Sequence, residues 1–378
     1  MESLATQQAP APGDAGSVRS YEEYRGRKYI PELDGLRAIS ILLVITWHMW
    51  DRPVFWEWLR GGEGVRIFFV LSGYLITTLL LEEESKRGKV SLPAFYVRRS
   101  CRIFPLYYVV LLAYCVLIYG FNSFAAKRAE MDYAMPYLLF YLQEIPFYLH
   151  PDGVWFPFYQ SWSLGIEEKF YLVWPVMAFI LLHGCRQWRL ALGVCFAALF
   201  AFLPLCGLGA WTSCVSDYYT ILVGCCAAIV LFEKRHYERL KGLGSALGSW
   251  CAFGFLLATH FSFERLPSVF VARLYPIAVA VFMVSLLAGR GLFGRALGCA
   301  PLVFIGKVSY GMYLVHLLCS NAANLVFRPG SGQWYIGVLA YLLTCLLCIA
   351  VAKVLSVTIE QPFIRIGHRW SARIFKKA

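Results

Sequence analysis

The stretch RAISILLVITWH, residues 37–48, carries an arginine and a histidine at the two ends of ten residues that are almost all apolar. In an α-helix eleven residues advance about 16 Å and complete three turns plus about 20°. Arg37 and His48 therefore share one face of the predicted helix, and Asp34 lies near that face. Ionisable side chains at membrane depth have to face protein or water rather than lipid, so this face is a candidate functional surface.

The composition around this stretch is typical of a membrane protein. Hydrophobic residues make up 59% of the 378 and charged residues only 15%, whereas about a quarter of an average soluble chain is charged. Apolar runs near the length that spans a bilayer recur along the chain. We therefore predict an all-α fold, a polytopic transmembrane helix bundle. The cysteines show no spacing that suits zinc, so we expect no metal.

Ten apolar runs are candidate spans. They lie at about 38–56, 64–81, 103–120, 168–183, 189–208, 215–232, 244–260, 268–288, 301–323 and 334–357. An eleventh run, 134–149, is short and contains two prolines, and we expect it to be an interfacial or re-entrant segment.

The net charge of +12 could suit nucleic acid, but the basic residues fall in short clusters between apolar runs. With ten spans these clusters share one side, which the positive-inside rule makes cytoplasmic. We expect an integral plasma (inner) membrane protein with both termini cytoplasmic, the lipid bilayer as its surroundings and no nucleic-acid partner. Residues 1–28 read as a disordered cytoplasmic tail, 29–365 as the transmembrane domain and 366–378 as a basic cytoplasmic tail.

The run FYVRRSCRIFP, residues 95–105, puts three arginines at the cytoplasmic end of the third predicted span. Arg98 and Arg102 share a helix face at i, i+4 spacing, and Arg99 lies beside them. Guanidinium groups match phosphate oxygens, which favours a site for a phosphate-bearing cytosolic donor. A simple topology signal is the alternative.

Two further motifs bring polar groups into apolar surroundings. The segment QSWSLGIEEKFYLVWP, residues 160–175, places Glu167 where a span begins on the outer side, either to orient a hydroxyl or support the histidine, or as an interfacial residue. Ser72 and Gly73 fall mid-span in VRIFFVLSGYLI, where a small-residue helix contact is the alternative to a functional role.

The segment GKVSYGMYLVH, residues 306–316, places Tyr310 and Tyr313 along a helix that leads to His316. His316 should lie in the outer half of the membrane. A lone histidine there is more often a packing residue than a catalytic one.

Together these motifs resemble the acyltransferase 3 family of integral-membrane acyltransferases, which modify surface polysaccharides and other hydroxyl-bearing acceptors. The resemblance covers about residues 29–365 and rests, in order, on LDGLRAISILLVITWH, FFVLSGYLI, RRSCRIFP, SWSLGIEEKFYLVWP and SYGMYLVH. It implies ten helices, an acyl-CoA donor, usually acetyl-CoA, that arrives from the cytoplasm, and an essential histidine at the position of His48. It also implies that the arginines at Arg37, Arg99 and Arg102 are needed for activity.

With this resemblance we expect a membrane O-acyltransferase that moves an acyl group, acetyl first, from acyl-CoA to a hydroxyl of a carbohydrate or other acceptor. The acyl-pantetheine arm would thread inward from the arginines to His48, the general base. Glu167, which occupies the acidic position of the family's SLxxE pattern, is the second catalytic candidate. The donor-binding candidates are Arg37, Arg98, Arg99 and Arg102, and the candidates for acceptor binding or oxyanion stabilisation are Asp34, Ser72, Tyr310 and His316.

Several alternatives stay open at this point. The acyl group could first form an intermediate on His48, the donor could be longer than acetyl, and the acceptor and the oligomeric state are not determined by the sequence. Because the chain ends about twenty residues after the last predicted span, we expect either direct transfer or a separate extracytoplasmic partner. The competing function is a proton-coupled transporter of an anionic solute, which would favour inverted repeats, and the two halves show no convincing self-similarity.

Overall fold

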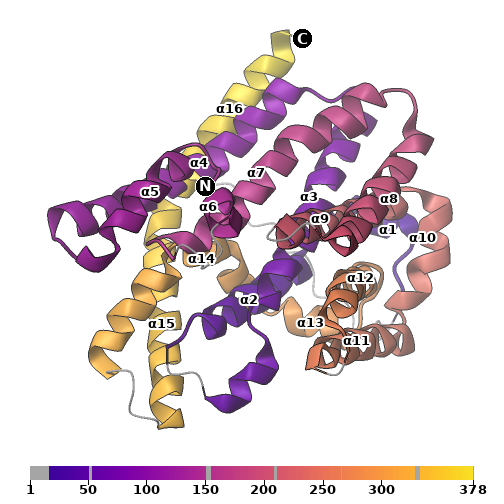
Figure 1. Ribbon diagram of the computed structural model, residues 1–378. Coiled ribbons are helices and arrows are strands. Elements are labelled where there is room, and N and C mark those ends of the chain that lie inside the picture. Colours follow the sequence, from indigo (N-terminus) through magenta and orange to yellow (C-terminus); the bar gives the residue numbers. More distant parts are fainter. Residues whose placement is uncertain are drawn as a thin grey trace.

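The computed structural model describes residues 17–50, 53–149, 155–207, 211–264, 266–327 and 333–377. Over these ranges the chain is almost entirely helical, and the β-structure in them is one isolated antiparallel bridge between Val18 and Gly289 (Figure 1). The predicted all-α fold is confirmed.

Each of the ten predicted apolar runs overlaps a helix of 14 residues or more. These helices are α2 (Pro31–Trp47), α3 (Glu63–Arg87), α4 (Leu92–Cys115), α7 (Trp162–Pro175), α8 (Arg186–Phe202), α9 (Trp211–Phe232), α11 (Ala246–Phe261), α12 (Ser268–Ala288), α14 (Ala300–Phe327) and α15 (Trp334–Leu355). Shorter elements connect them: α1 (Tyr21–Gly26), α5 (Arg128–Leu139), α6 (Glu144–Leu149), α10 (Lys234–Leu240) and α13 (Leu292–Leu297), with α16 (Gln361–Lys377) continuing α15 at the C-terminus.

The number of membrane crossings is smaller by length and composition than the ten expected. Seven helices in the described part of the chain are long and apolar enough to span a bilayer, or eight if the pair 234–244 and 246–261, bent by 83°, is one span. Helix α2 has only 17 residues, and α7 carries Glu167, Glu168 and Lys169. A count of ten spans is therefore not confirmed.

The first predicted span, 38–56, is wrong at its C-terminal end. Helix α2 begins at Pro31 and ends at Trp47, and a separate 3-10 helix occupies Val54–Leu59. Proline lacks an N–H donor and disfavours helical backbone at the residue before it, so Pro53 separates two apolar segments that the sequence joins. As a result His48 caps the C-terminus of α2 instead of lying inside a helix.

Parts of both expected tails have regular structure. Residues 17–28 include α1, whose first turn is closed by a capping box between Ser20 and Glu23. Residues 1–16 lie outside the described residues. At the other end, the tail expected from residue 366 is helical within α16. The run 134–149 forms parts of two short helices, α5 and α6, with a break between them.

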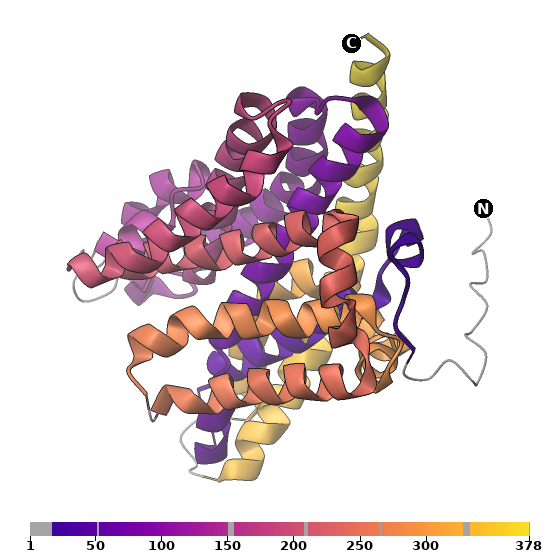
Figure 2. The same ribbon diagram turned by 90° about the vertical axis from the view of Figure 1, so that its right-hand side faces the viewer.

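Close helix pairs organise the bundle. Helix α3 packs along α9, and α14 packs between α2 and α15; α11 and α12 form a second pair that lies below α8 and α9 in Figure 2. The contact of α3 with α9 depends on two reciprocal glycines. A Cβ at Gly73 would lie 2.0 Å from the carbonyl oxygen of Ile221, and a Cβ at Gly224 would lie 2.0 Å from that of Val70. The small-residue helix contact expected at Gly73 is thus observed, as is common between membrane helices.

Candidate active site

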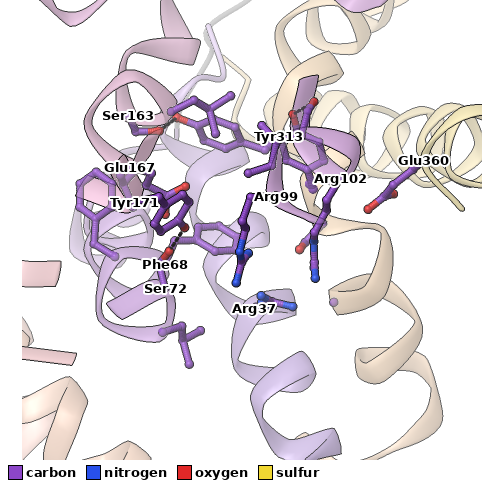
Figure 3. A pocket seen from close by; sticks show the side chains of 18 of the residues that line it. Arg37, Phe68, Ser72, Arg99, Arg102, Ser163, Glu167, Tyr171, Tyr313 and Glu360 are labelled. Carbon is purple, nitrogen blue, oxygen red and sulfur yellow. Dashed lines mark hydrogen bonds between the residues drawn. The ribbon is translucent and has the colours of Figure 1, made fainter. Parts of the chain in front are cut away.

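Three arginines from two helices meet in one cavity, which we name the arginine cavity. Arg37 comes from α2, Arg99 and Arg102 come from α4, and their guanidinium groups point toward one another in Figure 3. The cavity has a volume of about 120 Å³. The sequence predicted both arginine motifs as candidates for one donor site, and in the structure they lie together.

The arginine cavity is rich in positive charge. Its lining includes four basic side chains, Arg37, Arg99, Arg102 and Lys307, against two carboxylates, Glu167 and Glu360. Clustered guanidinium groups in a space of low dielectric repel one another unless an anion lies between them. The cavity therefore favours an anionic ligand.

The backbone around Arg37 is held by a close helix crossing. A Cβ at Gly306 of α14 would lie 1.9 Å from the carbonyl oxygen of Asp34, so only glycine allows this approach of α14 to α2. The Asp34 carboxylate accepts a hydrogen bond from the Tyr29 hydroxyl at 2.6 Å and pairs with Arg37 at 3.5 Å. Asp34, predicted as an acceptor or oxyanion group, is thus placed to orient Arg37.

Glu167 lies with the arginines. It lines the arginine cavity from α7, together with Ser72 of α3, whose hydroxyl is hydrogen-bonded to the hydroxyl of Tyr171 (Figure 3). Tyr310, the other suggested oxyanion donor, lines the same cavity and donates its hydroxyl to the carbonyl oxygen of Ile103 at 2.8 Å. The sequence grouped Glu167, Ser72 and Tyr310 with the histidine, whereas the structure gathers them around the arginines.

Arg98 takes a different position from its two neighbours. Its guanidinium donates to Glu83 and to the hydroxyl of Ser371, both at 2.6 Å. It lines a groove outside the arginine cavity, and Arg99 and Arg102 line both spaces.

His48 forms a pair with His316, which the sequence did not predict. The Nε2 atom of His316 lies 3.3 Å from Nδ1 of His48, and the ring centroids are 4.8 Å apart. His316 is fully buried and comes from α14. Two histidines 268 residues apart in the sequence therefore form one hydrogen-bonded unit.

Backbone carbonyl oxygens next to the two histidines show which ring nitrogen of each carries the hydrogen. Nδ1 of His316 lies 2.7 Å from the Tyr313 carbonyl oxygen, and Nδ1 of His48 lies 2.9 Å from that of Val44. A carbonyl oxygen only accepts, so both Nδ1 atoms carry hydrogen in the neutral rings. The one Nδ1–H of His48 is then shared between the Val44 carbonyl oxygen at 2.9 Å and Nε2 of His316 at 3.3 Å. The basic lone pair of His48 is on its Nε2 atom.

His48 lines a second cavity of about 680 Å³, which we name the histidine cavity. Its walls are mainly aromatic: Trp47, Trp50, Trp155, Phe156, Phe158, Tyr159 and Trp162. Several of these belong to the segment 155–162, which leads into α7; residues 150–154 lie outside the described residues. Lys127 and Asn321 add polar groups to the lining.

A partition of side chains lies between the two cavities. Val65 lines both cavities, and Phe68 and Tyr313 line the arginine cavity, their ring centroids 6.3 Å apart. The ring of Tyr313 lies 5.7 Å from that of His316. In this structure the arginines and His48 thus line two separate cavities that share Val65, and the predicted passage from the arginines to His48 is not one continuous cavity.

Two charged residues of the arginine cavity were not predicted as site residues. Lys307 lies one turn before Tyr310 on α14, and Glu360 lies in the helical turn that joins α15 to α16. Each is a charge next to a long apolar run, a signal that could have identified it.

Comparisons with known proteins agree with this architecture. A family model described as an acyltransferase domain, that of acyltransferase 3, matches residues 30–353. The peptidoglycan O-acetyltransferase OatA of Listeria monocytogenes is 30% identical over 312 residues, which cover 77% of this chain and 49% of that protein. The O-acetyltransferase OatA of Staphylococcus aureus is 27% identical over 383 residues, which cover 96% of this chain and 62% of that protein.

This chain thus spans about half to three fifths of the length of these two relatives. No solved structure was found to match it. The family model covers most of the chain and includes Arg37, His48, Arg99, Arg102 and Glu167. On this match, the protein belongs to the acyltransferase 3 family.

Proposed function

We propose that this protein is a membrane O-acetyltransferase that moves an acetyl group from acetyl-CoA to a hydroxyl of a carbohydrate. The observation that carries the proposal is the meeting of Arg37, Arg99 and Arg102 in one cavity, next to a second cavity that contains His48. One space suits an anionic donor and the other a bulky acceptor with hydroxyl groups. The donor, the acceptor and the roles of these residues are all part of the proposal.

The donor binds through its phosphates. CoA carries several negative charges on its nucleotide end, and guanidinium groups bind phosphate oxygens with paired hydrogen bonds. A space of about 120 Å³ holds only a slender part of such a molecule, since pockets for whole cofactors measure roughly 300–1,000 Å³. The pantetheine arm, narrow and uncharged, enters the arginine cavity with the thioester ahead.

The acetyl group is transferred at His48. An acceptor hydroxyl oxygen attacks the thioester carbonyl carbon while Nε2 of His48 takes its proton. The carbon–sulfur bond breaks, the ester forms, and the proton passes from His48 to the departing thiolate to give free CoA. The hydrogen bond from His48 Nδ1–H to His316 holds the ring in the tautomer that this step needs. A covalent acetyl intermediate on His48 is the variant of the same scheme.

The thioester has to pass the partition to reach His48. The Tyr313 hydroxyl is held by hydrogen bonds to Ser163 and to the carbonyl oxygen of Gln160. Rotation of the Tyr313 ring out of these contacts would open the way between the cavities. Transfer thus includes a side-chain movement as well as the chemical step.

The acceptor occupies the histidine cavity. Aromatic rings such as Trp155 and Trp162 offer flat apolar faces with polar edges, which suit the faces of sugar rings. The OatA relative from Listeria monocytogenes is named for peptidoglycan, and we take peptidoglycan as the first acceptor to test. The arginine cavity then faces the cytoplasm and the histidine cavity faces outward, with the protein in the plasma (inner) membrane.

The proposal is tested with the purified protein in lipid nanodiscs. The protein is incubated with acetyl-CoA carrying a labelled acetyl group and with solubilised peptidoglycan fragments, and both thiol release and label transfer are measured. We expect thiol release that depends on acceptor and an ester on the fragment, seen as a mass gain of one acetyl group. The variant His48→Ala should lose both signals.

The matched control is His183→Ala. His183 is an exposed histidine between α7 and α8, 3.7 Å from Glu84, outside both cavities, and its replacement should leave transfer unchanged. If acetyl-CoA neither binds nor turns over with any hydroxyl acceptor, or if His48→Ala transfers as well as the original protein, the proposed function is wrong.

A further inference from the structure

A groove between the C-terminal end of α3 and the N-terminal part of α4 is covered by the C-terminal helix, α16. It has a volume of about 510 Å³ and is lined by residues of α3, α4 and α16. In Figure 1, α16 lies beside the start of α4 at the end of the molecule that carries the C-terminus. Apart from Arg98, Arg99 and Arg102, no residue of this groove has been given a role above.

The groove adjoins the arginine cavity. Arg99 and Arg102 line both spaces, so one ligand can contact these two guanidinium groups from the groove and from the cavity. The groove is about four times the volume of the cavity. A ligand with a bulky anionic end and a narrow arm would fit the two spaces in that order.

The charge of the groove suits such a ligand. Five basic side chains line it against two carboxylates, which gives a formal excess of three positive charges with His368 neutral: Lys86, Arg87, Arg98, Arg99 and Arg102 against Glu82 and Glu83. The carboxylates already have basic partners, since Glu82 pairs with Lys86 at 3.2 Å and Glu83 pairs with Arg98 at 2.6 Å. Phosphate oxygens would therefore meet arginines rather than unpaired carboxylates.

The groove also offers a stacking surface. The guanidinium of Arg87 lies 3.7 Å from the centroid of the Phe375 ring, and that of Arg98 lies 5.7 Å from it. Guanidinium planes and aromatic rings stack on nucleobases. An adenine ring can take a place beside Phe375 while its phosphates reach the arginines.

Helix α16 is held in its position over the groove by contacts with α4. Gly367 is buried against α4, and a Cβ at this position would lie 2.7 Å from Cβ of Cys101. The hydroxyl of Ser371 accepts a hydrogen bond from Arg98 at 2.6 Å. These contacts make α16 an integral wall of the groove.

We propose that the groove between α3, α4 and α16 binds the nucleotide end of the CoA donor. The 3′-phosphate and pyrophosphate contact the arginines, the adenine stacks beside Phe375, and the pantetheine arm passes Arg99 and Arg102 into the arginine cavity. This inference rests on the proposed function, since it assumes that the donor is an acyl-CoA. It assigns donor binding to α16, a helix outside the match to the family model.

The test compares donors that differ only in the nucleotide. Acetyl-CoA, acetyl-dephospho-CoA, which lacks the 3′-phosphate, and acetyl-pantetheine, which lacks the whole nucleotide, are assayed with the original protein and with the double variant Arg87→Ala/Phe375→Ala. We expect KM of the original protein to rise from the first donor to the third. The double variant should raise KM for acetyl-CoA about tenfold or more, because each charge-assisted contact contributes about 1.5–3 kcal/mol, and leave KM for acetyl-pantetheine unchanged.

The matched control is Arg373→Ala. Arg373 is an exposed basic residue of α16 outside the groove lining, and its replacement removes the same charge without changing the groove. It should leave KM for all three donors unchanged. The assays are run in nanodiscs of phosphatidylcholine alone and of phosphatidylcholine with phosphatidylglycerol.

Three results overturn the inference. They are an unchanged KM for acetyl-CoA in the double variant, an equal rise for acetyl-CoA and acetyl-pantetheine, and an effect that appears only with phosphatidylglycerol, which would assign the groove to a lipid headgroup. Should the double variant not fold, the dephospho-CoA comparison in the original protein decides alone: equal KM values for all three donors overturn the assignment. A protein that uses none of the donors instead refutes the proposed function, so the two failures are distinguishable.

Discussion

The arginine cavity and the histidine cavity share one wall residue and differ in almost every other respect. The first is small, about 120 Å³, and is lined by four basic side chains and two carboxylates; the second is about 680 Å³ and mostly aromatic. The first suits the narrow part of an anion, and the second suits a large, neutral molecule with apolar faces. The contrast teaches that one bundle can hold two dissimilar substrates if each binds from its own side and only the reacting atoms meet.

The sharpest test of this division is His48→Gln. Glutamine keeps a side-chain hydrogen-bonding group but cannot act as a base, so kcat should fall by about 10²–10⁴-fold, the usual range for loss of a general base. The dissociation constant for CoA, measured by calorimetry, should stay the same because His48 lies outside the arginine cavity. A large loss of CoA affinity would show that His48 also contributes to donor binding and that the two cavities act as one site.

The reverse effect is expected from Arg102→Ala. Loss of a charge-assisted contact of about 1.5–3 kcal/mol should raise KM for acetyl-CoA by about 10- to 100-fold and leave kcat nearly unchanged. The effect should shrink as salt is added, since salt screens the phosphates. Steady-state kinetics over a salt series measure both, and a fall in kcat at constant KM would contradict a donor-binding role.

The substitution Gly306→Ala should affect both cavities because it changes the packing of α2 against α14. In Gly306→Ala the new methyl group would meet the Asp34 carbonyl oxygen at 1.9 Å, so α2 and α14 must separate. Overpacking of this kind costs about 1–3 kcal/mol and should lower the melting temperature and weaken CoA binding. The control is Gly254→Ala, a helical glycine with open space around it, which should melt no lower than the original protein because alanine favours helix more than glycine does.

The smallest effect is expected from His316→Phe. Phenylalanine keeps an aromatic ring at this place but has no nitrogen to accept the hydrogen bond from His48 or to bond the Tyr313 carbonyl oxygen. A hydrogen bond between neutral groups contributes about 0.5–1.5 kcal/mol, so kcat should fall by roughly 2- to 13-fold while donor KM stays constant. Because the lost bond positions His48, the double variant with His48→Gln should be no slower than His48→Gln alone. Additive losses would give His316 a separate role.

The sequence predicted the membership of the arginine cavity better than that of the histidine pair. Arg37, Arg99 and Arg102 belong to short motifs that marked them as donor-binding candidates. Helical period paired Arg102 with Arg98, whereas in the structure Arg99 joins Arg102 in the cavity and Arg98 lies outside it. The contact of His48 with His316 depends on how α2 crosses α14, which is set by the close approach at Gly306. The helical period indicates which residues share one face of a helix. Which other helix packs against that face depends on contacts between segments far apart in the chain.

The end of α2 shows the same limit for the fold. Hydrophobicity joined residues 38–56 into one span, but the chain turns after Trp47 and forms a separate 3-10 helix from Val54. Pro53, present in the sequence, was the local signal for this break. Glu360 was missed because it follows the last apolar run, where its distance from Arg102 could not be judged from the order of residues alone.

The partition between the cavities has a consequence for the cell that hosts this protein. A water-filled tunnel through the bundle would let ions leak across the bilayer and dissipate their gradients. In the proposed scheme, Val65 and Phe68 stay in place beside the arginine cavity and only the Tyr313 ring moves, so no continuous tunnel forms in the absence of substrates. Vesicles that contain the protein should therefore hold a pH gradient in the absence of substrates, and vesicles with Tyr313→Ala should lose it faster. The Tyr313 ring would then both control access of the thioester to His48 and prevent ions from leaking through the protein.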